Sequence, residues 1–118
     1  RTAMSVTIYH NPRCSKSRQA LQLLRERDVE PEIFEYLKTP PDAATLSQVL
    51  DMLGMEPREL MRKKEKEYKA QGLDNPELSR EQLIAAMVEH PRLIERPIVI
   101  KDGQAALGRP PEHVLDIL

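Results

Sequence analysis

The chain has 118 residues, a formal net charge of -1 and no tryptophan. A chain of this length buries one core and is too short to divide, so it predicts one domain with one site. Its 18 basic and 19 acidic residues create no field that draws a protein to nucleic acid or an anionic membrane. Three tyrosines and one phenylalanine offer few platforms for stacking bases. We therefore expect neither nucleic-acid nor membrane binding.

The sequence contains one cysteine, Cys14. It forms no internal disulfide and no multi-cysteine zinc site, so we expect a reducing compartment, the cytoplasm, and no bound metal or cofactor. The sequence has no apolar run of about 20 residues and no secretion signal. Met4 resembles a natural start, so residues 1–3 are interpreted as a remnant ahead of a single domain at residues 4–118.

The first part of the chain predicts a β-α-β unit. Residues 5–9 are rich in β-branched and aromatic side chains and run into a proline-containing loop, which indicates a strand. Apolar residues at helical spacing predict a helix that begins at or just after Cys14. Residues 32–37 predict a second strand, and the intervening helix favours parallel pairing with a right-handed crossover.

The middle of the chain predicts helices. An apolar stripe beginning after residues 40–42 and stopped by Gly54 indicates an amphipathic helix. Residues 58–68 are dense in charge and predict one short helix. Residues 79–82 form a capping box that opens a further helix, which Pro91 ends.

The last part of the chain predicts a hairpin and a final helix. Apolar residues 98–100 and 105–107 flank an Asp-Gly pair, which is a strong signal for antiparallel strands. Residues 110–111 place proline at a helix start. The expected fold class is α/β: a mixed four-stranded sheet, β-α-β then β-β-α, with a helical insertion in the middle.

Cys14 stands where a helix favours the thiolate. Unpaired N–H groups and the macrodipole of a first turn present partial positive charge, which stabilises a thiolate and can hold an anionic substrate. Arg13, Lys16, Arg18 and His10 add basic groups. Alternatives remain open from the residues alone: Cys14 as a small buried apolar residue, Arg13 and Lys16 as solvated charges, and Ser17 as either a helix cap or a substrate contact.

Four segments, residues 10–18, 60–63, 93–99 and 108–111, resemble in order and spacing the signatures of the glutaredoxin-dependent arsenate reductase family. The resemblance is nearest to a short subgroup of arsenate reductase-like proteins, because the chain ends where the studied enzymes carry an extension. It implies a thioredoxin-like fold with a helical insertion. It also implies that Cys14 attacks arsenate and that Arg62, Arg96 and Arg109 bind the oxyanion.

The resemblance assigns supporting roles as well. It implies that His10 influences the ionisation of the cysteine and that Pro97 is cis and faces the thiol, whereas sequence alone favours trans. Guanidinium groups stay charged and present paired donors that suit tetrahedral oxyanions. From the residues alone, Arg62 is interpreted as a solvated member of a charged run. For Arg96 and Arg109, the alternative to oxyanion binding is a surface arginine without a binding role.

The predicted reaction reduces arsenate with external thiols, because no second cysteine exists to resolve an adduct. Glutathione is then the reducing co-substrate and glutaredoxin the protein partner. One alternative is a monothiol glutathione-dependent oxidoreductase with another substrate. Another is a non-catalytic regulatory adaptor like the Spx proteins, which typically carry C-x-x-C, where this chain has Ser17.

Overall fold

The computed structural model describes residues 6–118. The predicted remnant at residues 1–3, and Ser5 of the first predicted strand, lie outside this range. The chain forms two compact units, one made of the residues up to Thr39 together with Arg96–Leu118, and the other of Pro40–Glu95. We call them the sheet unit and the helical unit. The helical unit occupies the place in the chain where the helical insertion was predicted.

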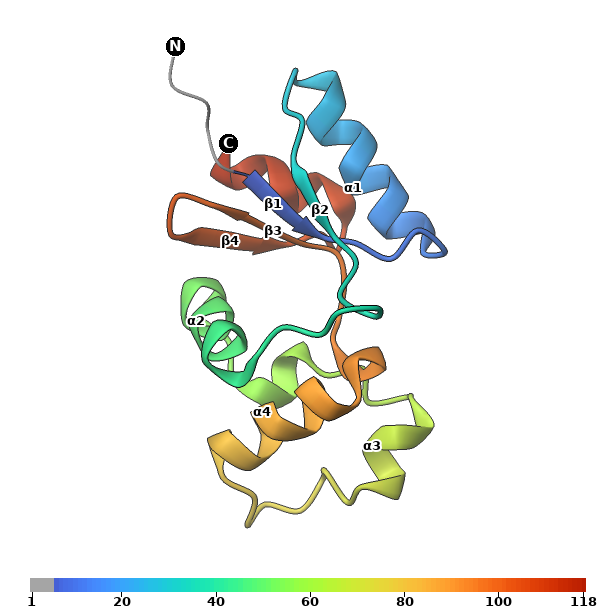
Figure 1. Cartoon of the computed structure of the whole chain (residues 1–118), viewed down its shortest axis with the longest axis vertical. Coiled ribbons are helices and arrows are strands. Elements are labelled where there is room, and N and C mark those ends of the chain that lie inside the picture. Colours follow the sequence, from blue (N-terminus) through green and yellow to red (C-terminus); the bar gives the residue numbers. More distant parts are fainter. Residues whose placement is uncertain (1–5) are drawn as a thin grey trace. The chain divides into compact units, whose positions relative to one another are not determined.

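The sheet unit contains β1 (Val6–Tyr9), β2 (Glu32–Phe34), β3 (Ile98–Lys101) and β4 (Gln104–Leu107). Over the described residues they form one four-stranded sheet in the order β2-β1-β3-β4 (Figure 1). β1 pairs in parallel with β2 and antiparallel with β3, and β3 pairs antiparallel with β4. This arrangement confirms the predicted mixed sheet.

The second strand is shorter than the predicted range 32–37. β2 is an edge strand whose last pair, Tyr9 with Phe34, coincides with the end of β1. Beyond it, the Glu35 carbonyl accepts the N–H groups of Lys38 and Thr39, at 3.0 and 3.1 Å. The backbone therefore forms a turn after Phe34, although the pattern of side chains alone predicted that the strand continues to residue 37.

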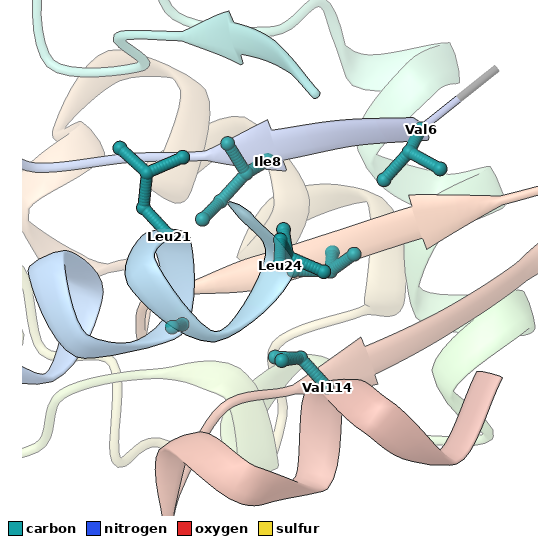
Figure 2. Packing of buried hydrophobic residues seen from close by; sticks show 7 residues of the cluster. Val6, Ile8, Leu21, Leu24 and Val114 are labelled. Atoms are coloured by element: carbon teal, nitrogen blue, oxygen red, sulfur yellow. The ribbon is translucent and has the colours of Figure 1, made fainter. Parts of the chain in front are cut away.

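One face of the sheet is covered by α1 (Ser15–Glu26) and by the 3₁₀ helix η3 (Pro111–Ile117). Side chains from both helices meet those of β1 and β3 in a buried apolar cluster, which Figure 2 shows: Val6, Ile8, Ala20, Leu21, Leu24, Val99 and Val114. The predicted final helix thus exists, but as a 3₁₀ helix. Burial of this face holds α1, and with it Cys14, against the end of β1.

The hairpin between β3 and β4 follows the predicted Asp-Gly turn. Asp102 and Gly103 have φ values of 50° and 79°. Two consecutive positive φ values are what a two-residue turn of type I′ requires, and Gly adopts them without steric cost.

The helical unit contains α2 (Ala43–Leu53), α3 (Lys66–Ala70) and α4 (Arg80–Glu89). The Asp42 side chain accepts the Thr45 N–H at 2.7 Å at the start of α2, and Gly54 ends that helix in the left-handed conformation. Ser79 and Gln82 make both bonds of the predicted capping box. The ends of α2 and α4 therefore lie where the capping residues predicted them.

Two 3₁₀ helices, η1 (Pro57–Leu60) and η2 (Pro91–Leu93), were not predicted. Both begin with proline, which suits the first position of a helical turn. With only four and three residues, however, they are too short to show an apolar periodicity in the sequence. The predicted short helix in the charged run corresponds to α3, which extends to Ala70. Across residues 6–118, no helix has the length and apolar character needed to cross a membrane.

Leu24 tests the core under the sheet. It is fully buried, whereas its neighbour Leu23 on the same helix is only partly buried. We expect Leu24→Ala to lower the free energy of unfolding by about 2–5 kcal/mol in urea titrations. Leu23→Ala, with the same change in helix propensity, should cost less than half as much; equal losses would contradict the assigned core.

Candidate active site

Cys14 lies at the end of a tight loop that joins β1 to α1. The His10 N–H donates to the Phe34 carbonyl at 2.9 Å, which continues the β1–β2 pairing by one residue. The Asn11 carbonyl accepts the Cys14 N–H at 2.9 Å, and the Asn11 side chain accepts the Arg13 N–H at 3.0 Å. Cys14 is the N-cap of α1 and has an extended conformation, so the helix begins just after Cys14, as the sequence predicted.

The thiol of Cys14 is buried, yet its surroundings favour the thiolate. Burial raises the pKa of Cys14, but the backbone N–H of Ser17, the charge of Arg96 and the N–H of Lys16 outweigh it, so the pKa lies below the ordinary thiol value. A side-chain hydrogen bond from Arg96 acts in the same direction. The first turn of α1 and one arginine from the distant segment before β3 thus converge on one sulfur atom.

A buried hydrogen bond connects His10 with Ser17. Ser17 Oγ and His10 Nδ1 are 2.6 Å apart, and the Asn11 N–H donates to the same Ser17 oxygen at 3.1 Å. Ser17 therefore contacts the loop before Cys14, instead of capping its own helix. If Nδ1 is the unprotonated nitrogen of a neutral His10, the Ser17 hydroxyl donates to it.

The surroundings of His10 favour its neutral form. Burial lowers the pKa of His10, and the charges of Arg25 and Arg18 act in the same direction against an opposing effect of Glu35. Arg18 also donates to the Pro12 carbonyl at 2.9 Å. Beside this loop lies an open hollow of about 570 Å³, lined by His10, Pro12, Arg18, Leu21, Gln22, Arg25 and Glu26.

The other predicted residues of the sheet unit lie where β3 begins and β4 ends. The Arg96–Pro97 peptide bond is cis, as the resemblance implied, and so is the Arg109–Pro110 bond. Arg109 Nη1 donates to the Arg96 carbonyl at 3.3 Å, and the Gly108 N–H donates to the Pro97 carbonyl at 2.8 Å. Two arginines 13 residues apart in sequence are thereby held in adjacent loops.

Arg62 belongs to the helical unit. Its backbone N–H donates to the Leu93 carbonyl at 2.7 Å, so its segment is tied to the one that leads to Glu95. Arg62 Nη2 lies 3.1 Å from Glu65 and Nε lies 3.8 Å from Glu95, while Glu65 also pairs with Arg92 at 3.0 Å. Arg62 is thus an ion-paired, partly buried arginine and not the solvated charge that its sequence neighbourhood alone suggests.

Sequence reasoning missed Asn11, which orders the loop through its carbonyl, its N–H and its side chain. An asparagine between a strand and a proline is a recognisable turn signal. It also missed Glu65 and Glu95, for which the charged run offered no distinguishing pattern. Among the described residues, no three or more His, Cys, Asp or Glu side chains form a group suited to a metal ion.

Removal of the Ser17 hydroxyl tests the buried network. We expect Ser17→Ala to lower the free energy of unfolding by about 1–3 kcal/mol, because it leaves His10 Nδ1 and the Asn11 N–H without this partner. Ser15→Ala, at an exposed position in the same turn, is the control and should stay within about 0.5 kcal/mol of the wild type. Urea unfolding measures both, and a neutral Ser17→Ala would contradict the network.

Comparison with known proteins gives the chain a family. The model of the ArsC family matches residues 9–117. The chain is 60% identical over 114 residues, 96% of each chain, to the uncharacterized protein YfgD of Escherichia coli. It is 49% identical over 114 residues to the arsenate reductase of Neisseria meningitidis serogroup A, covering 96% of this chain and 97% of that protein.

Solved structures agree with these relatives. An arsenate reductase from Vibrio cholerae superposes with a TM-score of 0.96 at 52% identity, covering 99% of this chain and all of that one. A putative arsenate reductase from Yersinia pestis superposes with a TM-score of 0.91 at 50% identity, covering 95% of this chain and 99% of the other. The predicted thioredoxin-like fold is confirmed, and the chain belongs to the ArsC family.

Proposed function

We propose that this protein reduces arsenate to arsenite through a covalent adduct on Cys14, with glutathione and glutaredoxin as electron donors. The observation that carries the proposal is the meeting of the Cys14 thiol with the first-turn N–H groups of α1 and the Arg96 guanidinium. A nucleophile and hydrogen-bond donors suited to an oxyanion therefore lie next to each other. The family and the arsenate reductases among its relatives supply the substrate.

The first step forms a sulfur–arsenic bond. The Cys14 thiolate attacks arsenic(V), one arsenate oxygen takes up a proton, and water leaves. No electrons reach arsenic in this step, so the product is an arsenate thioester. A lowered thiol pKa favours the step because the thiolate is the nucleophile, and donors arranged in advance stabilise the charge that develops on the remaining oxygens.

Reduction then requires two electrons from outside the chain. The thiol of glutathione attacks the arsenic of the adduct and displaces a second water. The glutaredoxin thiolate then attacks the glutathione sulfur, so that the two external thiols end as a mixed disulfide and the electron pair of the broken sulfur–arsenic bond stays on arsenic, now arsenic(III). Hydrolysis of the remaining bond between Cys14 and arsenic releases arsenite and restores the thiol. A chain with one cysteine has no internal thiol for this purpose. The dependence on a glutathione pool favours the cytoplasm, and none of these steps calls for a resident metal or cofactor.

Arg96, Arg109 and Arg62 are the proposed oxyanion ligands. Arg96 interacts with the thiol and Arg109 donates to the Arg96 backbone, which supports both as neighbours of the reacting sulfur. Arg62 is the third arginine assigned by family resemblance. Its pairing with Glu65 and Glu95 holds the guanidinium in a defined orientation within the helical unit.

Arsenite formation with glutathione and glutaredoxin tests the reaction. We expect Cys14→Ser to abolish it and Arg96→Gln to lower kcat/KM for arsenate by on the order of 100-fold, because a donor to the developing charge is lost. Arg62→Gln and Arg109→Gln should fall in the same class. Arg27→Gln, an exposed arginine at the far end of α1, is the matched control and should retain wild-type kinetics.

The same assay separates the alternative functions. A wild-type protein that forms no arsenite but releases glutathione from a glutathionylated peptide is a monothiol oxidoreductase. A protein that is inactive in both assays but co-purifies with RNA polymerase, which the Spx proteins bind, is a regulatory adaptor. Either result would overturn arsenate as the substrate.

Alkylation of Cys14 tests its activation without any substrate. Because only the thiolate reacts, the rate follows its ionisation, and a lowered pKa moves the midpoint to lower pH. We expect a midpoint below the roughly 8.5 of an unperturbed thiol, a return to that value in denaturant, and a higher midpoint in Arg96→Gln than in wild type. A folded protein that titrates like the denatured one would contradict a poised nucleophile.

A further inference from the structure

Gly108 occupies a position with no room for a side chain. A Cβ atom placed on it would lie 2.7 Å from Pro97 Cγ, 3.2 Å from Pro97 Cδ and 3.1 Å from Val114 Cγ1. Contacts below 3.0 Å essentially do not occur between real Cβ atoms and their neighbours. Unlike Gly54, Gly72 and Gly103, Gly108 does not have a positive φ. Glycine is therefore required at position 108 because neighbouring atoms occupy the space of a Cβ atom, and not because of the backbone conformation.

The neighbours of Gly108 cannot easily yield. The Pro97 ring is closed on its own backbone and has no free rotation that would carry Cγ away. Val114 is fully buried in the cluster beneath the sheet. A side chain at 108 would thus displace backbone, either the segment of Arg96 and Pro97 or the segment that leads through Arg109 into η3.

Both segments carry the arginines of the candidate site. Leu107 pairs with Ile98 at the end of the hairpin, and the Gly108 N–H donates to the Pro97 carbonyl at 2.8 Å, which extends this pairing by one residue. Arg109 follows Gly108, and its guanidinium donates to the Arg96 carbonyl at 3.3 Å. The close approach of Gly108 to Pro97 therefore sets how the Arg96 and Arg109 backbones lie relative to each other.

We propose that Gly108 is a positioning residue for the active site: by leaving room for the Pro97 ring, it holds Arg96 beside the Cys14 thiol and Arg109 beside Arg96. The inference deepens the proposed function, since it takes these two arginines as ligands of the oxyanion. Its effect on the thiol is independent of the substrate. Arg96 favours the thiolate, so a shift of Arg96 changes the ionisation of Cys14 whether or not arsenate is the oxyanion.

The test is Gly108→Ala, the smallest side chain available. We expect the alkylation midpoint of Cys14 to move toward the value of the denatured protein. We also expect KM for arsenate to rise on the order of 10- to 100-fold, as small misplacements of binding groups do, with KM for glutathione unchanged. Wild-type values for both the alkylation midpoint and the arsenate KM, in a folded variant, would overturn the proposal.

Gly103→Ala is the matched control. It lies in the turn of the same hairpin, its Cβ would meet nothing within 4 Å, and its φ of +79° disfavours alanine. It should lower the melting temperature through backbone strain and leave the Cys14 midpoint and the arsenate KM unchanged. If it shifts the midpoint as much as Gly108→Ala does, general destabilisation of the hairpin is the cause and the positioning role is wrong.

A second variant identifies the partner of Gly108 and covers a failure to fold. In a Pro97→Ala background, which removes Cγ and Cδ, Gly108→Ala should leave the alkylation midpoint at the value of Pro97→Ala and change KM for arsenate by less than about twofold, because interacting positions are not additive. If Gly108→Ala alone does not fold, Pro97→Ala should restore its folded yield. Restoration by Val114→Ala but not by Pro97→Ala would place the clash in the core and overturn the proposal.

If wild-type protein forms no arsenite, the proposed function fails, while the alkylation measurements still decide the role of Gly108.

Discussion

The hydrogen bond between Ser17 and His10 joins the end of β1 to the first turn of α1, and the position of Cys14 depends on it. The loop between them is short, and its remaining bonds run through Asn11. Because the buried face of α1 is anchored on the sheet, neither end of the loop can move away. Cys14 is thereby held as the N-cap, with the first-turn N–H groups directed at its sulfur.

Two opposing electrostatic effects meet at this sulfur. Burial disfavours the charged thiolate, whereas fixed dipoles and one guanidinium favour it, and the second effect is larger. A buried site strengthens the same dipoles toward an anionic substrate, because little water screens them. A neutral His10 fits this balance, since burial disfavours the protonated imidazole.

The hairpin of β3 and β4 connects the apolar core with the candidate site. Val99 lies in the cluster beneath the sheet, while the residues just outside the two strands, Pro97 and Gly108, are joined by a backbone hydrogen bond of 2.8 Å. Packing of α1 and η3 on one face thus fixes the loops that carry Arg96 and Arg109. The short β3–β4 pairing therefore contributes both to the packing of the core and to the positions of the two arginines, because close-packed elements transmit small shifts.

Local chemistry in the sequence determined much of the fold. Strong caps at Asp42 and Ser79, the Asp-Gly turn and the apolar spacing after Cys14 each act within a few residues, so their elements were predictable. Elements without such signals were not: β2 ended early where a turn competed, and η1 and η2 are too short to show a period. The start of a helix at or just after Cys14 followed from the sequence, but the ionisation of its thiol did not. Only the tertiary structure places Arg96 beside the thiol, joins Ser17 to His10 by a hydrogen bond and leaves no space for a side chain between Gly108 and Pro97. The first and third of these contacts join residues far apart in sequence, and the second spans a loop whose conformation local sequence signals do not specify.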